Sequence, residues 1–563
     1  MAQKEATNST DIKQLGLVAA LASLGYVFWV VGAMEMVERL AYYGVRAVAG
    51  LYATAPASEG GLGVTAAKFG IILMVWSGFQ GFLPIVVGGL ADRYGYKLTI
   101  AISTVVKMVA YLIMAFFPTF YGFLVGAIFL ATGTAIFKPG IQGTLAKATK
   151  PENSSMAWGV FYQTVNIGGF IGPVMAGFLR KMEWSNVFFA CAAIIALNFI
   201  LLLTYKEPGL EERLAKAKER EAKHEKQRNI ILETLSELRR PHLCVFLAIF
   251  TGFYFMFNCL FDVLPLHIRD WVDSRDVVNT VSQIFDINNP VLGFVMILDK
   301  TKTYVQPEGM LNLNCAMIMF TCFFFAWLSS KMRILRSIAL GTSLAALSMC
   351  LIGISHMGWF CLLSIAVFSI GEMLSSPKFS EFVGTHLASS DKKGMYLGLG
   401  QMSFAIGSTL EGLIAPRLYD MLSSKDTFSR EMLLELKLVT PQQLEAIKPG
   451  EAFNQLVLLS GRAPEELTQF MYHHHSVASM WYIMAGVGFL TALLILIYSF
   501  WWARTGTSAA VVAINERQEE KPTSEALTPA SEESPQPLIQ EGPLGEAQET
   551  APSKEEDSPQ NSG

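Results

Sequence analysis

Residues 20–52 read ALASLGYVFWVVGAMEMVERLAYYGVRAVAGLY, a long apolar stretch that carries four charged side chains in its central part. Such a stretch is long enough to cross a bilayer as a helix, which takes roughly 20 apolar residues for about 30 Å of hydrocarbon. A charge at that depth is costly unless it is paired or hydrated, and it marks a functional position by default. The stretch predicts a membrane-spanning helix whose charged side faces protein.

The charged side of this helix can be read from its spacing. Glu35, Arg39, Tyr42, Tyr43 and Arg46 share one side at helical periodicity. Glu35 can pair with Arg39 one turn along, and Glu38 lies beside that pair with a proton affinity set by the nearest cation. We interpret the group as one that can load and release a proton. The alternative is a static knot of ion pairs that only locks helices together.

Stretches of similar hydropathy recur along the chain. The 563 residues are 52% hydrophobic and only 16% charged, and the mean hydropathy of +0.38 is too high for an ordinary soluble domain. Twelve spans are expected, near 20–52, 68–90, 97–117, 120–145, 155–179, 184–205, 241–268, 310–330, 335–355, 358–388, 394–420 and 477–503. They form two halves of six.

The spans divide the chain into five parts. We expect a cytoplasmic N-terminus, a six-helix bundle, a charged cytoplasmic linker, a second six-helix bundle and a disordered cytoplasmic tail, at 1–19, 20–205, 206–240, 241–503 and 504–563. Two inserts near 269–309 and 421–475 fall on the outer side. Lys and Arg gather in the loops on the other side, so both termini are expected inside a plasma (inner) membrane.

Further polar side chains are expected at membrane depth. Lys138 lies in GTAIFKPGIQG, where a buried lysine needs a carboxylate and Glu35 or Glu38 is the obvious candidate. Tyr162 and Asn166 lie on the fifth span beside small residues.

In the second half, Glu372 lies deep in the tenth span just before Pro377, a good place for an ammonium group or a proton. Three further charges have equal claims to helix pairing and to transport, namely Lys107, Asp262 and Glu411. Asp92 and Arg93, in a glycine-rich turn between spans two and three, are expected to make a cytoplasmic gate contact.

Other classes of function have little support. The seven cysteines show no metal-binding spacing, and no nucleophile, zinc or phosphate-loop motif is present. We therefore expect no enzyme activity, no metal, no cofactor and no nucleic-acid partner.

Together these residues resemble the proton-dependent oligopeptide transporter family of the major facilitator superfamily. Residues 35–44 are similar to its E-x-x-E-R-F-x-Y-Y-G signature, with Leu40 in place of Phe. Lys138-Pro139 looks like its K-P motif, and 161–168 looks like its F-Y-x-x-x-N-x-G segment. Residues 371–377 resemble its G-E-x-x-x-S-P segment, and Asp92-Arg93 fits the loop motif of the superfamily.

The resemblance implies an all-α fold of two six-helix bundles with inverted repeats, and a proton-coupled importer of di- or tripeptides that works as a monomer within membrane lipid. The implied site residues are Glu35, Glu38, Arg39 and Lys138 for proton coupling, and Arg39, Tyr42, Tyr43, Arg46, Lys138, Tyr162, Asn166 and Glu372 for substrate. The family's acid in the seventh span is not evident, because Asp262 is the only nearby acid and is displaced.

Two alternatives stay open at this point. The chain could be a proton-linked porter for another small organic solute. It could also be a non-transporting membrane receptor of the same fold, for which the long outer insert and the acidic tail are the best support.

Overall fold

The computed structural model describes residues 17–150, 153–211, 237–388 and 393–519. In this part of the chain the regular structure is helical, apart from two isolated β-bridges. Twelve described helices have 20 residues or more, namely α2 (Tyr26–Thr54), α3 (Ala66–Tyr94), α4 (Tyr96–Phe116), α5 (Phe120–Ala148), α6 (Ser154–Leu179), α7 (Trp184–Leu203), α10 (Pro241–Asp262), α14 (Pro307–Ser330), α15 (Ile334–Ile354), α16 (Gly358–Phe382), α17 (Lys393–Leu422) and α22 (Ser479–Glu519).

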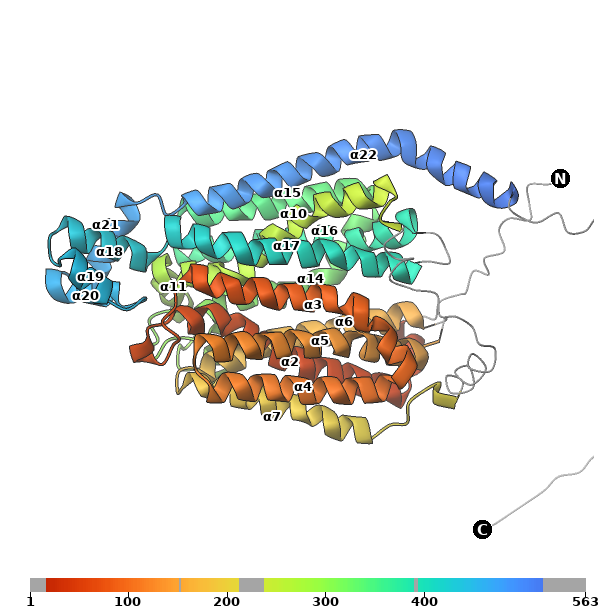
Figure 1. The fold of residues 1–563 in the computed structure, drawn as a ribbon, viewed down its shortest axis with the longest axis horizontal. Coiled ribbons are helices and arrows are strands. Elements are labelled where there is room, and N and C mark those ends of the chain that lie inside the picture. Colours follow the sequence, from red (N-terminus) through yellow and green to blue (C-terminus); the bar gives the residue numbers. More distant parts are fainter. Residues whose placement is uncertain (1–16, 151–152, 212–236, 389–392, 520–563) are drawn as a thin grey trace, which may run out of the picture. The chain divides into compact units, whose positions relative to one another are not determined.

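Within the compact unit that ends at Gly506 and includes α22 as far as that residue, the long helices lie side by side as two groups (Figure 1). In the first group α2 packs on α6 and α7, and α5 packs on α3 and α4. In the second group α16 packs on α14 and α15, and α10 packs on α17. The groups meet where α3 contacts α17 and α6 contacts α14.

Nine of the described helices are long and apolar enough to cross a membrane. The helices α2, α6 and α17 complete the set of twelve by length and packing. α2 is less apolar because it carries Glu35, Glu38, Arg39 and Arg46. The predicted twelve-helix fold is confirmed, and the chain is a multi-pass membrane protein.

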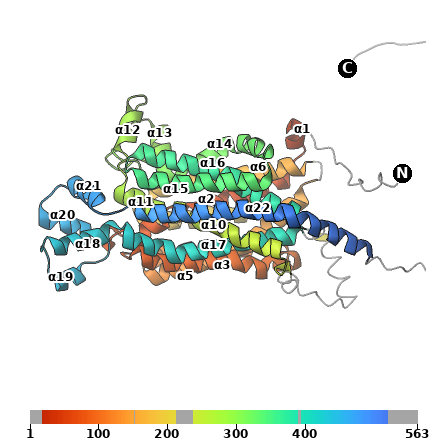
Figure 2. The ribbon, with the colours of Figure 1, turned by 90° about the horizontal axis from the view of Figure 1, so that it is seen from above.

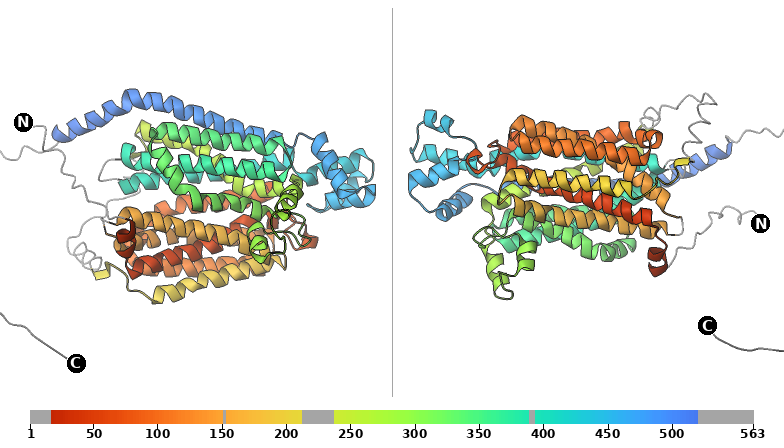
Figure 3. Two further views of the ribbon diagram at one scale, coloured as in Figure 1. Left: turned by 180° about the vertical axis from the view of Figure 1, so that it is seen from behind. Right: turned by 90° about the horizontal axis from the view of Figure 1, so that it is seen from below.

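The shorter helices gather mainly at one end of the bundles. They are α1 (Leu17–Ala22), η1 (Ala57–Glu59), α11 (Leu264–Trp271), α12 (Arg275–Ser282), α13 (Pro290–Met296), η2 (Val383–Leu387), α18 (Lys425–Glu435), α19 (Pro441–Ala446), α20 (Ala452–Ser460) and α21 (Pro464–His474). We call the end that carries α11–α13 and α18–α21 the insert end (Figures 2 and 3).

Two expected spans are each divided into two helices. The expected span 20–52 consists of α1 and α2, which are separated at the extended Gly25. Within the expected span 241–268, α10 ends at Asp262 and a second helix, α11, begins at Leu264. Pro265 explains the second break, because proline has no N–H to continue the hydrogen bonding of α10.

Glycines set the distance between α2 and α6. A Cβ built on Gly168 would lie 2.6 Å from the carbonyl oxygen of Met36, and one on Gly172 would lie 2.5 Å from that of Leu40. No side chain fits at these separations, so the G-x-x-x-G spacing brings the two backbones into direct contact. This packing fixes the charged side of α2 against α6.

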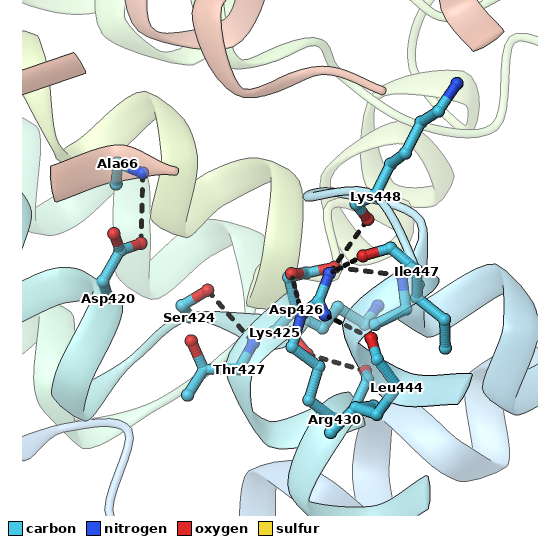
Figure 4. A network of polar contacts seen from close by, with 12 residues as sticks. Ala66, Asp420, Ser424, Lys425, Asp426, Thr427, Arg430, Leu444, Ile447 and Lys448 are labelled. Carbon is cyan, nitrogen blue, oxygen red and sulfur yellow. Dashed lines mark hydrogen bonds and ion pairs between the residues drawn. The ribbon is translucent and has the colours of Figure 1, made fainter. Parts of the chain in front are cut away.

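The second insert, which contains α18–α21, has its own apolar core and its own polar network. Phe428, Leu433, Leu456 and Leu467 are buried in one cluster. The guanidinium of Arg430 donates to the carbonyl oxygen of Leu444 in α19 and to those of Ile447 and Lys448 in the connection that follows (Figure 4).

At the base of the insert, Asp420 joins the two bundles. Its carboxylate accepts from the backbone N–H groups of Ala66 at 3.1 Å and Ala67 at 2.6 Å, at the start of α3 (Figure 4). A carboxylate at a helix N-terminus satisfies orphan donors and interacts favourably with the helix dipole.

Candidate functional site

The four acidic and basic side chains at the middle of the first bundle form one buried cluster. Glu38 is fully buried and forms ion pairs with Arg39 and with Lys107 on α4, whose Nζ lies 2.6 Å from a Glu38 oxygen. Arg39 also reaches Glu35 one turn away, at 3.2 Å between Nε and Oε1. We call Glu35, Glu38, Arg39 and Lys107 the α2 cluster.

Lys107 fits this cluster because α5 leaves room for it. A Cβ on Gly133 would lie 2.6 Å from Cγ of Lys107, so only glycine lets the lysine stem pass. The ammonium lies 4.0 Å from the centroid of the Phe137 ring, a cation–π geometry. Lys107 is fully buried and therefore depends on Glu38 for charge compensation.

The expected pairing of Lys138 with Glu35 or Glu38 is not found; Lys107 occupies that role. Lys138 is half-buried and lies within electrostatic range of both carboxylates and of Arg39. With Glu35 and Glu38 ionised, Arg39, Lys107 and Lys138 leave the neighbourhood with one net positive charge. One further carboxylate would neutralise it.

A carboxylate of the second bundle lies opposite. Glu372 on α16 accepts from Nδ2 of Asn314 on α14 at 3.0 Å, and the same amide nitrogen lies 3.0 Å from Oγ of Ser369. Lys378, which also lies on α16, pairs with Glu381 at 2.6 Å and not with Glu372. Glu372 has no cation partner among the described side chains, so its charge is available to a ligand.

Aromatic side chains lie between the two poles. Tyr43 and Tyr162, both of the first bundle, lie within electrostatic range of Glu372 across the interface. Tyr162 is 47% exposed, whereas Asn166 is nearly buried and donates to the Tyr162 carbonyl oxygen of its own helix at 3.0 Å. Tyr43 and Tyr162 can thus contact a molecule held between the bundles.

Two predicted residues of α2 make contacts further toward the insert end. Tyr42 donates to Gln80 on α3 at 2.9 Å. Arg46 lies over the Trp76 ring at 5.1 Å and donates to Asp262 on α10 at 2.6 Å. Asp262 is therefore not an isolated acid, because it forms an ion pair across the bundle interface.

A second ion pair crosses between the bundles, at the insert end. Arg180, directly after α6, pairs bidentately with Glu308 on α14 and donates to Gln306. Within the described residues these are the two ion pairs that join the bundles, and both lie on the insert side of the α2 cluster. The bundles are thus tied together on that side.

A cavity of about 390 Å³ lies at the insert end, between α11, α12 and α21. Asp270, Arg275, Lys425 and Tyr472 are among its lining residues. Burial lowers the pKa of Lys425 to about 8. Burial also opposes ionisation of Asp270, but the Arg269 guanidinium beside it holds the pKa of Asp270 below its usual value. This cavity is separate from the predicted site residues.

The predicted gate residues Asp92 and Arg93 belong to the last turn of α3, and their side chains lie outside the described part. The turn that follows has Gly95 at a φ of 113°, which favours glycine.

Sequence reasoning did not assign Lys107 and Asn314 to the site. Lys107 stands in the middle of a 21-residue apolar helix, and this depth was the available signal. Asn314 had no such signal, because a single amide in an apolar helix is explained equally well by helix packing.

Comparison with known proteins gives three kinds of likeness. The model of the Major Facilitator Superfamily matches residues 40–410. The uncharacterised transporter YclF of Bacillus subtilis is 27% identical over 181 residues, which are 31% of this chain and 37% of that protein. The peptide transporter YePEPT of Yersinia enterocolitica is 28% identical over 174 residues, 30% of this chain and 34% of that protein.

These two alignments therefore span little more than a third of each relative. The likeness in fold extends further. A crystal structure of a POT family transporter in complex with 5-aminolevulinic acid superposes with a TM-score of 0.60 and 15% identity, over 86% of this chain and 99% of that one.

Proposed function

This chain belongs to the major facilitator superfamily, and we propose that it is a proton-coupled symporter that carries di- and tripeptides by alternating access. Its family consists of transporters, so the prediction that it is not an enzyme is confirmed. Its fold is that of the peptide transporters among the solved structures. The peptide substrate and the coupling to protons are the parts proposed here.

One observation carries the proposal: the two bundles present opposite charges to the interface between them. The first bundle offers the net positive surroundings of Arg39 and Lys138, and the second offers Glu372. A zwitterionic peptide has a carboxylate and an ammonium several ångströms apart. Pairing each end with a protein charge compensates for the desolvation that a site at the membrane midplane requires.

Two related proteins support a peptide as the proposed substrate. YePEPT is a peptide transporter, and 5-aminolevulinic acid, bound by the POT family structure, carries an amine and a carboxylate like a dipeptide. We therefore favour a peptide over a solute with charge of one sign.

Purified protein in liposomes tests the proposal. Dipeptides should accumulate when the pH gradient is imposed and equilibrate when it is absent, and a protonophore should remove the difference. Accumulation of another solute class, with no response to any dipeptide, would favour the alternative porter. Binding without counterflow would favour a receptor.

We expect Glu372→Gln to weaken binding of free dipeptides by 10- to 150-fold, because a charge-assisted hydrogen bond to the ammonium contributes about 1.5 to 3 kcal/mol. The affinity for amino-blocked dipeptides should fall far less, because these peptides have no ammonium group to pair with Glu372. Competition binding measures both, with Glu381→Gln as a control, because Glu381 is paired with Lys378. Equal losses for free and blocked peptides, together with a lower melting temperature, would contradict the assignment.

We also propose that the termini and the linker near 206–240 face the cytoplasm, and that the insert end faces outward. Single cysteines placed in the two inserts, at Ile284 in the first or Leu458 in the second, should react with an impermeant reagent from outside, since both positions are exposed. A cysteine in the linker should react only after the membrane is opened. Labelling of the linker from outside would reverse the topology.

A further inference from the structure

The acidic side chain of Glu411, on α17, is buried beside the Arg46–Asp262 ion pair. It is fully buried, and neither of its carboxyl oxygens has a hydrogen-bond donor. Asp262 lies within hydrogen-bonding reach of it, and Arg46 lies within electrostatic range. Glu411 therefore adds a second carboxyl group to a site that holds one guanidinium.

The surroundings of Glu411 are protein and not lipid. A Cβ on the neighbouring Gly412 would lie 2.7 Å from the backbone nitrogen of Met74, so α3 touches α17 there. One turn earlier, a Cβ on Gly407 would lie 2.6 Å from the carbonyl oxygen of Thr251 on α10. Glu411 is thus enclosed between α3 and α10.

The titratable groups around Glu411 come from α2 and α10. Arg46, Tyr42 and Tyr43 come from α2, and Asp262 and Cys259 come from α10. Arg46 is the only cation among them in the described residues. Two ionised carboxylates would leave one uncompensated negative charge at a buried site, which like-charge repulsion and desolvation both oppose.

We propose that Asp262 and Glu411 form a carboxyl pair that holds one proton beside Arg46, with the proton on Glu411. The O–H of Glu411 then donates to the Asp262 carboxylate, and Asp262 remains paired with Arg46. The site is electrically neutral, and the protonated oxygen of Glu411 gains a partner.

Infrared spectroscopy of the purified full-length protein tests the shared proton without any substrate. Wild-type protein at neutral pH should show the carbonyl stretch of a buried carboxylic acid that is missing from Glu411→Gln. Asp262→Asn should also abolish this absorption, because Glu411 can then ionise and pair with Arg46. Glu381→Gln, which changes an exposed and paired acid, should leave it intact.

An unchanged carboxylic-acid absorption in Glu411→Gln would overturn the proposal. Its persistence in Asp262→Asn would overturn the sharing, because the proton would then stay on Glu411 without a partner acid. Should Glu411→Gln fail to fold, Asp262→Asn still decides the matter. A protein that shows the expected spectra but transports no peptide would refute the proposed function and leave the shared proton standing.

Discussion

Lys107→Met is expected to lower the free energy of unfolding by about 3 to 5 kcal/mol, the usual effect of removing one partner of a buried ion pair. The ammonium of Lys107 and the carboxylate of Glu38 are both fully inaccessible to solvent, at 2.6 Å from each other. Methionine has a similar length and no charge. The variant therefore leaves Glu38 with Arg39 as its remaining cation.

The reaction of buried cysteines with a thiol reagent during thermal unfolding measures this loss, because Cys191, Cys259 and Cys361 are buried in the folded protein. Lys68→Met is the matched control, since Lys68 also lies on a helix but is exposed. The double variant Lys107→Met, Glu38→Gln should regain most of the stability, because both charges are then absent. A loss no larger than that of Lys68→Met would contradict the pairing.

The fold could be predicted almost entirely from hydropathy. Twelve apolar stretches of bilayer length leave few arrangements, and most observed helix ends differ from the expected ones by a few residues. The exception is α22, which continues from the expected end at 503 to Glu519, into the stretch expected to be a disordered tail. The breaks at Gly25 and Val263 were missed, because an apolar window does not register a single residue that interrupts backbone hydrogen bonding.

The site was harder to predict, since pairing depends on which helices become neighbours. The sequence places Lys138 and Lys107 at similar depth in two spans, and nothing local tells which one meets Glu38. The pairing of Lys107 with Glu38 depends on Gly133, because a glycine at this position of α5 lets the Lys107 stem pass toward α2. The predicted roles of Arg39, Lys138 and Glu372 in binding and coupling remain predictions.

The same reasoning explains the apparent displacement of Asp262. A motif search looks for an acid at one register of the seventh span, whereas the structure requires only a carboxylate within reach of Arg46. α10 meets α2 closely enough for this contact: a Cβ on Gly50 would lie 3.3 Å from the carbonyl oxygen of Asp262. Distance in space, and not position in a motif, selects the partner.

The structure also distinguishes the two acids of α2, which the sequence treated as equal candidates for coupling. Glu38 is held by two cations and is fully buried. Glu35 has Arg39 as its ion-pair partner, its side chain is 8% exposed, and its Oε2 has no hydrogen-bond donor. Protonating Glu35 therefore breaks fewer interactions than protonating Glu38.

We accordingly expect Glu35→Gln to abolish dipeptide accumulation driven by a pH gradient, while counterflow of dipeptide without a gradient continues, because an amide cannot carry the proton but leaves Arg39 paired with Glu38. Uptake and counterflow in the same liposomes measure the two activities. Glu38→Gln should instead depress both and lower the melting temperature, since it leaves Lys107 buried without its carboxylate. If Glu35→Gln accumulates dipeptide as the wild type does, Glu35 is not the coupling acid, and the Asp262–Glu411 pair becomes the remaining candidate.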